Sequence, residues 1–99
     1  MTRFDWDENK NRTNRNKHGI GFETAVGAFA DPYAIARVDR VVDGEERWHT
    51  IGCLDDGTLV ILIAHTVTDK EVEVVARLIS ARKATPRERR LYEKGDWDE

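Results

Sequence analysis

The pattern of apolar and polar positions predicts two helices near the N-terminus. Asp7 is a suitable N-cap for a polar helix over Glu8–Lys17, which His18-Gly19 would end. Four apolar residues then recur at the spacing of one buried helical stripe, which predicts a second helix: Phe22, Ala25, Val26 and Phe29. Asp31-Pro32 ends this helix, because the residue before a proline is pushed out of the helical region.

From Tyr33 onward the apolar positions recur with a period of two, which predicts strands. The predicted strands are Tyr33–Val42, Arg47–Leu54, Leu59–Thr66 and Glu71–Ala81, with Arg3–Trp6 as a short additional candidate. The segments between them have the composition of turns: Asp43-Gly44, Asp55-Asp56-Gly57 and Thr68-Asp69-Lys70. Such short connections predict an antiparallel meander.

The last helix has a clear start signal in Thr85-Pro86-Arg87-Glu88. These residues supply an N-cap hydroxyl, a proline at the first helical position and a glutamate at the third. Gly95 is suited to close the helix. The prediction is therefore a single α+β domain over residues 1–99, with two N-terminal helices, an antiparallel sheet of about four to five strands and a C-terminal helix.

Composition argues against several protein classes. The longest apolar run, Leu59–Ala64, has six residues, whereas a bilayer span needs roughly 20, so no membrane segment is expected. The first residues contain no apolar stretch typical of a secretory signal. A lone cysteine, Cys53, cannot form an internal disulfide, which fits a cytoplasmic protein.

Charge is segregated along the chain, although the formal net charge is only −3. Residues 74–94 carry seven Lys/Arg against two acidic residues, whereas residues 39–73 carry three against nine. This distribution predicts one basic face on an acidic body, a feature of nucleic-acid-binding proteins. The alternative explanation for these basic residues is an ordinary solvent-exposed C-terminal helix. Charge alone favours this alternative over a nucleic-acid-binding face.

Blocks of residues spread over nearly the whole chain carry a family resemblance. The strongest block is Ile79–Thr85 running into Arg87-Glu88-Arg89-Arg90. Others, in matching order and spacing, are Phe4-Asp5-Trp6-Asp7, Lys17-His18-Gly19, Phe29-Ala30-Asp31-Pro32 and Asp43–Trp48. Together they resemble BrnT-type toxins of prokaryotic type II toxin–antitoxin systems.

The resemblance implies a RelE-like fold and a ribonuclease that cleaves RNA and inhibits translation. It also implies a BrnA-like antitoxin of the ribbon-helix-helix type, which binds and silences the toxin. Because ribbon-helix-helix proteins dimerise, the implied complex is a 2:2 heterotetramer, and operator DNA is reached only through the antitoxin. The basic surface of the toxin is expected to be the surface that the antitoxin covers.

Cleavage of RNA without a metal needs a proton acceptor for the 2′-hydroxyl, cations for the phosphate and an acid for the leaving oxygen. The three histidines, His18, His49 and His65, lack metal-ligand spacing, so neither a metal nor a cofactor is expected. Arg82 and Arg77 are the predicted phosphate cations, with surface salt bridges as the alternative. Five residues apart, they fall on opposite faces of a strand unless a bulge intervenes.

Glu88 and His65 are the predicted proton-transfer residues. Glu88 lies among arginines, which would keep it ionised and make it a weak base or an arginine-positioning residue. The Thr85–Glu88 capping box explains this glutamate equally well. His65 ends the most apolar strand, and imidazole titrates near neutral pH, although a histidine in such a place is more often structural.

Five further residues are predicted to contact RNA: Arg89, Lys83, Tyr92, Trp48 and Lys17. Cationic side chains pair with phosphates, and aromatic rings stack on unpaired bases. The structural alternatives are a solvated helix face for Arg89, packing against the sheet for Tyr92 and Trp48, and the helix dipole for Lys17. The main alternative function is a RelE-like binding module that has lost catalysis and acts only in a repressor complex with antitoxin and operator.

Overall fold

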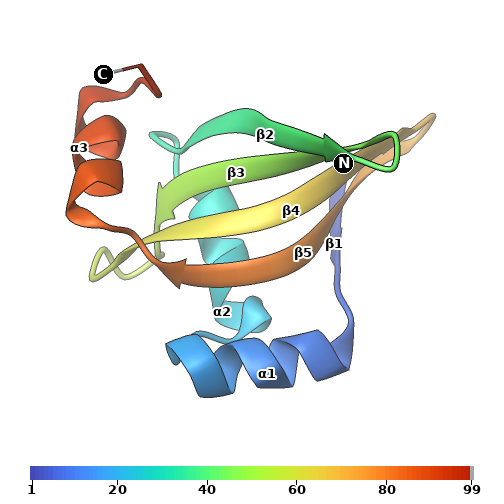
Figure 1. Ribbon diagram of the computed structural model, residues 1–99, viewed down its shortest axis with the longest axis horizontal. Coiled ribbons are helices and arrows are strands. Elements are labelled where there is room, and N and C mark those ends of the chain that lie inside the picture. The colour runs from blue at the N-terminus through green and yellow to red at the C-terminus, as the bar shows by residue number, and fades with distance from the viewer. Residues whose placement is uncertain (99) are drawn as a thin grey trace.

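Each predicted strand and helix has a counterpart in the structure, a computed structural model that describes residues 1–98 (Figure 1). The elements in chain order are β1 (Thr2–Asp5), α1 (Glu8–His18), α2 (Phe22–Ala25), the 3-10 helix η1 (Val26–Ala30), β2 (Ile35–Val42), β3 (Glu45–Cys53), β4 (Val60–Lys70), β5 (Glu73–Lys83) and α3 (Pro86–Lys94). The predicted α+β class is confirmed. The second helix is shorter than predicted, because its last five residues tighten into η1.

One five-stranded sheet, in the order β1-β5-β4-β3-β2, forms the centre of the molecule. Strands β2 to β5 form the predicted antiparallel meander. β1 instead pairs in parallel with β5, with Thr2 opposite Val74 and Asp5 opposite Arg77. The prediction of a purely antiparallel sheet is therefore wrong, because a four-residue strand carries no local signal for the direction in which it pairs.

The two faces of the sheet differ in what covers them. α2 and η1 pack against one face, here called the helix face, where Ile61, Ile63, Leu78 and Ala81 belong to the core. The residues that alternate with these point to the opposite side, here called the open face. α3 packs near β3 at one end of the open face and leaves the rest of it uncovered (Figure 1).

α1 completes the edge of β5 beyond the point where β1 ends. Asn14 donates from Nδ2 to the carbonyl oxygen of Ala81 (2.9 Å) and accepts at Oδ1 from the Ala81 N–H (3.0 Å). The same Nδ2 also donates to the carbonyl oxygen of Ile20 (2.9 Å). Since Asn14 is buried, its side chain takes the place of a neighbouring strand for backbone groups that water does not reach.

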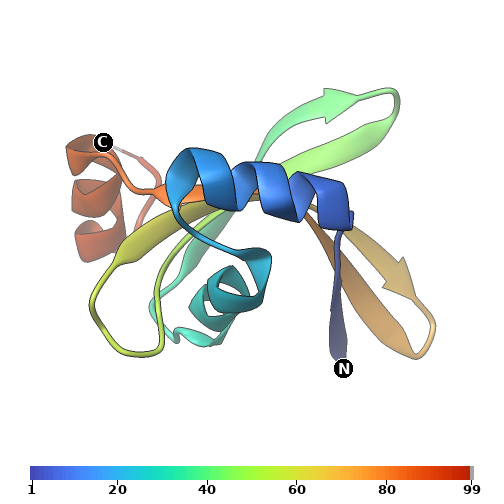
Figure 2. The ribbon, with the colours of Figure 1, turned by 90° about the horizontal axis from the view of Figure 1, so that it is seen from below.

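The turn between β4 and β5 lies further along the chain than predicted. Thr68-Asp69-Lys70 belongs to β4, and the connection is Glu71-Val72. This hairpin extends past the core into solvent, and its residues are exposed. Its strands therefore carry polar residues, whose composition resembles that of a turn. The β2–β3 hairpin also extends past the helices, and the two hairpins diverge from each other (Figure 2).

Candidate functional site

A bulge in β5 brings the two arginines from the predicted site onto one face of the sheet. Arg77 is opposite Thr66 and Arg82 is opposite Leu62, with a break in register between Ala64 and His65. Thr66 and Leu62 share the open face, because β4 itself alternates regularly. Their partners therefore share it too, although Arg77 and Arg82 are five residues apart.

The same register keeps the two guanidinium groups apart. Their partners on β4 are four residues apart, which corresponds to about 13 Å along the strand. Arg77 pairs with Asp5 (Nη1–Oδ2 2.7 Å), and Arg82 pairs with Glu88 through two hydrogen bonds of 2.8 and 2.9 Å. Arg77 and Arg82 thus face the same side of the sheet but are held at separate points on it.

Glu88 takes part in both arrangements that the sequence suggested for it. Its Oε1 accepts from the Thr85 N–H (2.9 Å), and its own N–H donates to the Thr85 hydroxyl (3.2 Å), which is a complete capping box. The hydrogen bonds from Arg82 hold the pKa of Glu88 down to about 2. A carboxylate with this pKa is ionised at neutral pH and accepts a proton poorly, so the geometry makes it an anchor for Arg82.

We expect the Arg82–Glu88 pair to make stability depend on pH. The pKa of Glu88 is lowered from 4.5 to about 2 on folding, so its contribution is complete above pH 4.5 and is lost as pH falls toward 2. Glu88→Gln should lower the free energy of unfolding by about 1–2 kcal/mol at neutral pH, because the Arg82 side chain is 35% exposed and water screens the pair. Urea unfolding at neutral pH and near pH 3 measures the difference in free energy of unfolding between the wild type and Glu88→Gln. A difference of equal size at both pH values contradicts the expectation.

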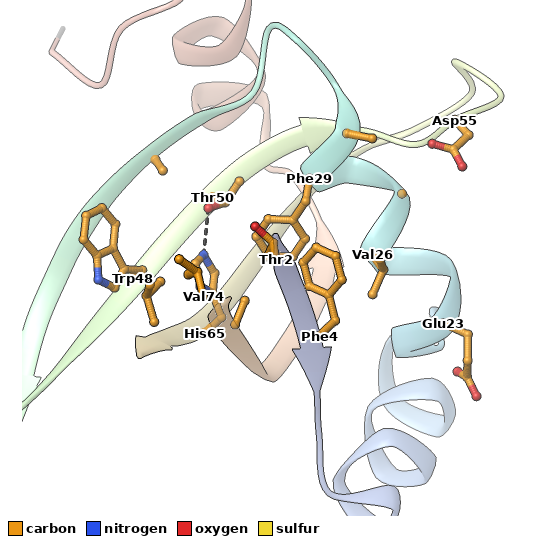
Figure 3. A pocket seen from close by; sticks show the side chains of 15 residues that line it. Thr2, Phe4, Glu23, Val26, Phe29, Trp48, Thr50, Asp55, His65 and Val74 are labelled. Carbon is orange, nitrogen blue, oxygen red and sulfur yellow. Dashed lines mark hydrogen bonds between the residues drawn. The ribbon is translucent and has the colours of Figure 1, made fainter. Parts of the chain in front are cut away.

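His65 lies on the helix face, away from both arginines. It is 3% exposed, and its ring meets Phe29 edge-on, with 4.9 Å between ring centroids (Figure 3). Nδ1 donates to the Thr66 carbonyl oxygen (3.2 Å), which leaves Nε2 to accept from the Thr50 hydroxyl (2.8 Å). Burial lowers the pKa of His65, so it is a neutral residue whose two ring nitrogens are both occupied inside the fold.

Tyr92 links α3 to the segment before β2. Its hydroxyl donates to Oδ2 of Asp31 (2.5 Å), and this hydrogen bond raises the pKa of Tyr92 to about 12. Asp31 also accepts from the backbone N–H groups of Tyr33 and Cys53 (2.9 and 2.8 Å). The structure therefore uses Tyr92 and Asp31 to fasten the C-terminal helix to the sheet.

The other predicted RNA contacts are spread over the molecule. Trp48 is half-buried on the helix face, where it lines a cavity together with His65 (Figure 3). Lys17 is exposed near the end of α1, Lys83 is exposed at the end of β5, and Arg89 is half-buried on α3. The structure brings together Arg82 and Glu88 on the open face and Trp48 and His65 on the helix face, and it does not gather the predicted residues into one site.

The β2–β3 hairpin supplies functional candidates that the sequence reasoning missed. Arg37 is opposite His49, and Arg40 is opposite Arg47. His49 is also opposite Ala64, a residue of the open face, so these four side chains share that face with Arg77 and Arg82. Part of this signal was present in the sequence, because alternation places Arg47 and His49 on one face and the Asp43-Gly44 turn pairs Arg40 with Arg47. Arg37 comes to lie opposite His49 only through the break in register between Val38 and Arg40.

Basic side chains gather on this hairpin, and carboxylates lie next to them. Arg40 and Arg47 are like charges directly opposite each other, an arrangement that destabilises a sheet. Each has an acidic neighbour: Nε of Arg40 lies 3.5 Å from Oδ2 of Asp39, and Nη2 of Arg47 lies 3.6 Å from Oε1 of Glu45. Among residues 1–98, the buried Nε of Arg47 has no hydrogen-bond partner. His49 lies with Nε2 3.7 Å from Oδ2 of Asp39, and the Arg37 guanidinium stacks 4.4 Å from the ring centroid of Trp97.

The described residues contain neither a metal-binding cluster nor a membrane-spanning helix. Within residues 1–98, histidine, cysteine and carboxylate side chains form no group of three or more that could hold a metal ion. In that same part of the chain, the helices are all too short or too polar to cross a membrane.

Comparison with known proteins assigns the chain to a family. No curated protein gave a match. A family model described as the ribonuclease toxin, BrnT, of type II toxin–antitoxin systems matches residues 6–88, which include α1, the four long antiparallel strands and the Arg82–Glu88 pair. The chain therefore belongs to the BrnT family of ribonuclease toxins of type II toxin–antitoxin systems.

Proposed function

We propose that this chain is a metal-independent endoribonuclease that binds RNA across the open face of its sheet and so inhibits translation. The observation that carries the proposal is the set of basic side chains on that face: Arg37, Arg40, Arg47, His49, Arg77 and Arg82. They come from β2, β3 and β5, and together they form a surface suited to successive phosphates of a single strand.

The proposed chemistry uses the 2′-hydroxyl of the RNA as the nucleophile. His49 is the proposed proton-transfer group, because histidine is the side chain most often used in general acid–base catalysis and Oδ2 of Asp39 lies 3.7 Å from its Nε2. Arg47 and Arg37 lie beside it and would stabilise the charge that develops on the phosphate. His49 takes the proton of the 2′-hydroxyl as its oxygen bonds to phosphorus, the bond from phosphorus to the 5′-oxygen breaks, and the leaving oxygen takes a proton from water.

Arg82 and Glu88 have a different part in this proposal. The two parallel hydrogen bonds from Arg82 to Glu88 hold its guanidinium at the end of the open face, next to α3. In that position Arg82 would hold a neighbouring phosphate, with Glu88 as its positioning residue. Neutralisation by a BrnA-like ribbon-helix-helix antitoxin, in a 2:2 heterotetramer in the cytoplasm, belongs to the same proposal.

Two double variants with equal change in charge test where RNA binds. Replacing Arg37 and Arg47 with alanine should weaken binding to single-stranded RNA by about ten- to a hundredfold. It should also reduce the slope of log affinity against log salt by about 1.4, because each phosphate contact on a single strand contributes about 0.7. The matched control replaces Arg12 and Arg90 with alanine, at exposed positions on α1 and α3. It should keep the RNA affinity and the salt slope of the wild type.

The same purified protein, free of antitoxin, should cleave RNA in the presence of EDTA. Cleavage that stops on chelation would contradict the metal-independent mechanism. Tight RNA binding without cleavage would favour the alternative, a binding module that acts in a repressor complex. Equal losses in the two double variants would show that RNA does not use the open face.

A further inference from the structure

An open cavity lies on the helix face, on the side opposite the arginines. Its volume is about 670 Å³, and it is lined by α2, η1, β1 and the helix face of the sheet (Figure 3). Its lining is mainly apolar and includes Phe4, Val26, Phe29, Trp48 and Val74. In Figure 3, Phe4 and Phe29 lie on the side of η1, and Trp48 lies across the hollow from them.

The apolar surface continues from this cavity onto the two hairpins. Val38 is opposite Trp48, and Val67 is opposite Ala76, so both lie on the helix face. They are 37% and 40% exposed, and Val41 further along β2 is 61% exposed. α2 and η1 end short of these hairpins (Figure 2). A monomer rarely leaves a continuous apolar surface of this kind uncovered without a binding role.

The charges around this surface are acidic. Among the cavity-lining residues, the carboxylates are Glu23 and Asp55, and lysine and arginine are absent from the described lining. Alternation places Glu46 on the helix face two residues before Trp48, and Asp69 two residues after Val67. The surface is thus apolar in the middle and negative at its border, which favours a partner with apolar residues in the middle and lysine or arginine on either side.

Neither α1 nor α3 of a second copy of this chain supplies such a partner segment. α1 is rich in Lys and Arg, but it contains no apolar residue. In α3 the apolar residue Leu91 is already buried, and Tyr92 is bound to Asp31. Neither helix offers a free apolar stripe, so the partner that fits is a different protein.

We propose that this surface binds an amphipathic helix of the antitoxin, with apolar residues spaced three and four apart and basic residues on its borders. The inference rests on the proposed function, because it states where on the toxin its antitoxin binds and which residue types the binding segment carries. A helix in an apolar groove is a common mode of peptide recognition. It places this antitoxin segment on the face opposite the arginines, whereas the sequence-based expectation had the antitoxin cover the basic surface.

The experiment measures binding of a purified BrnA-like ribbon-helix-helix protein to this chain. Val38→Lys combined with Val67→Lys puts positive charge on the apolar surface and should weaken this binding at least about a hundredfold. RNA cleavage should stay at the wild-type rate, because both valines face away from the open face. The matched control is Val72→Lys, at an 87% exposed turn position, which should bind like the wild type. Circular dichroism checks that each variant is folded.

The Arg37→Ala, Arg47→Ala double variant separates this inference from the proposed function. It should bind the antitoxin like the wild type and fail in RNA binding. If RNA cleavage is absent in every protein but the valine variant alone loses the antitoxin, the proposed function fails and the docking surface stands. The inference is overturned if the antitoxin does not bind, if the valine variant binds it normally, or if only the arginine variant loses it. Self-association that the valine variant abolishes would also overturn it.

Discussion

Replacing His49 with alanine is expected to slow RNA cleavage by about a hundred- to ten-thousand-fold, the usual contribution of general acid–base catalysis. His49 lies opposite Arg37 and close to Asp39, so the change removes the proposed proton-transfer group from among the phosphate-binding arginines. RNA affinity should change little, since those arginines remain. Single-turnover cleavage with saturating protein measures the rate, and binding to the same RNA measures affinity.

His18→Ala is the matched control, because this histidine ends α1 and lies outside the open face. It should cleave RNA at the wild-type rate. Asp39→Asn should give a smaller loss than His49→Ala, since it leaves the imidazole in place and removes only the carboxylate beside it. A His49→Ala protein that is folded and cleaves at full rate would assign proton transfer to another group.

Replacing Asn14 with alanine is expected to lower the free energy of unfolding by about 3 kcal/mol. The change leaves the N–H and carbonyl oxygen of Ala81 and the carbonyl oxygen of Ile20 without their partner. An unsatisfied buried polar group costs about 1–3 kcal/mol, and water that enters the space recovers part of this. Because a small domain is stable by only about 5–15 kcal/mol, the loss is large.

Urea unfolding measures the effect of the Asn14 change. Asn16→Ala is the control on the same helix, at an exposed position, and it should change the free energy of unfolding by less than about 0.5 kcal/mol. A loss as small as that of Asn16→Ala would mean that the Asn14 side chain does not stabilise the edge of β5.

Local sequence signals predicted the ends of elements well. Asp7 accepts hydrogen bonds from two N–H groups of the first turn of α1, and Gly19 closes that helix with φ 74°. Asp43 and Gly44 both have positive φ, 51° and 80°, as a two-residue hairpin turn requires. Caps and tight turns depend on only a few neighbouring residues, so their signals survive in any tertiary context.

Predictions that depended on distant contacts fared less well. Composition placed a turn at Thr68–Lys70, but pairing of Lys70 with Glu73 carries the hairpin further. The direction of β1 is decided by the edge of β5 that it joins, at the far end of the sequence. In both cases the structure of the segment depends on a strand that pairs with it and that lies elsewhere in the sequence.

The sequence by itself determined the family, the α+β class and the helix caps. Only the tertiary structure decided which charged side chains lie together. A bulge at one position of β5 turned Arg82 to the side of Arg77, and a second bulge, in β2 between Val38 and Arg40, brought Arg37 opposite His49. The physical reason is that alternation assigns a side chain to one of two faces, whereas strand register, bulges and the packing of helices determine which face stays open.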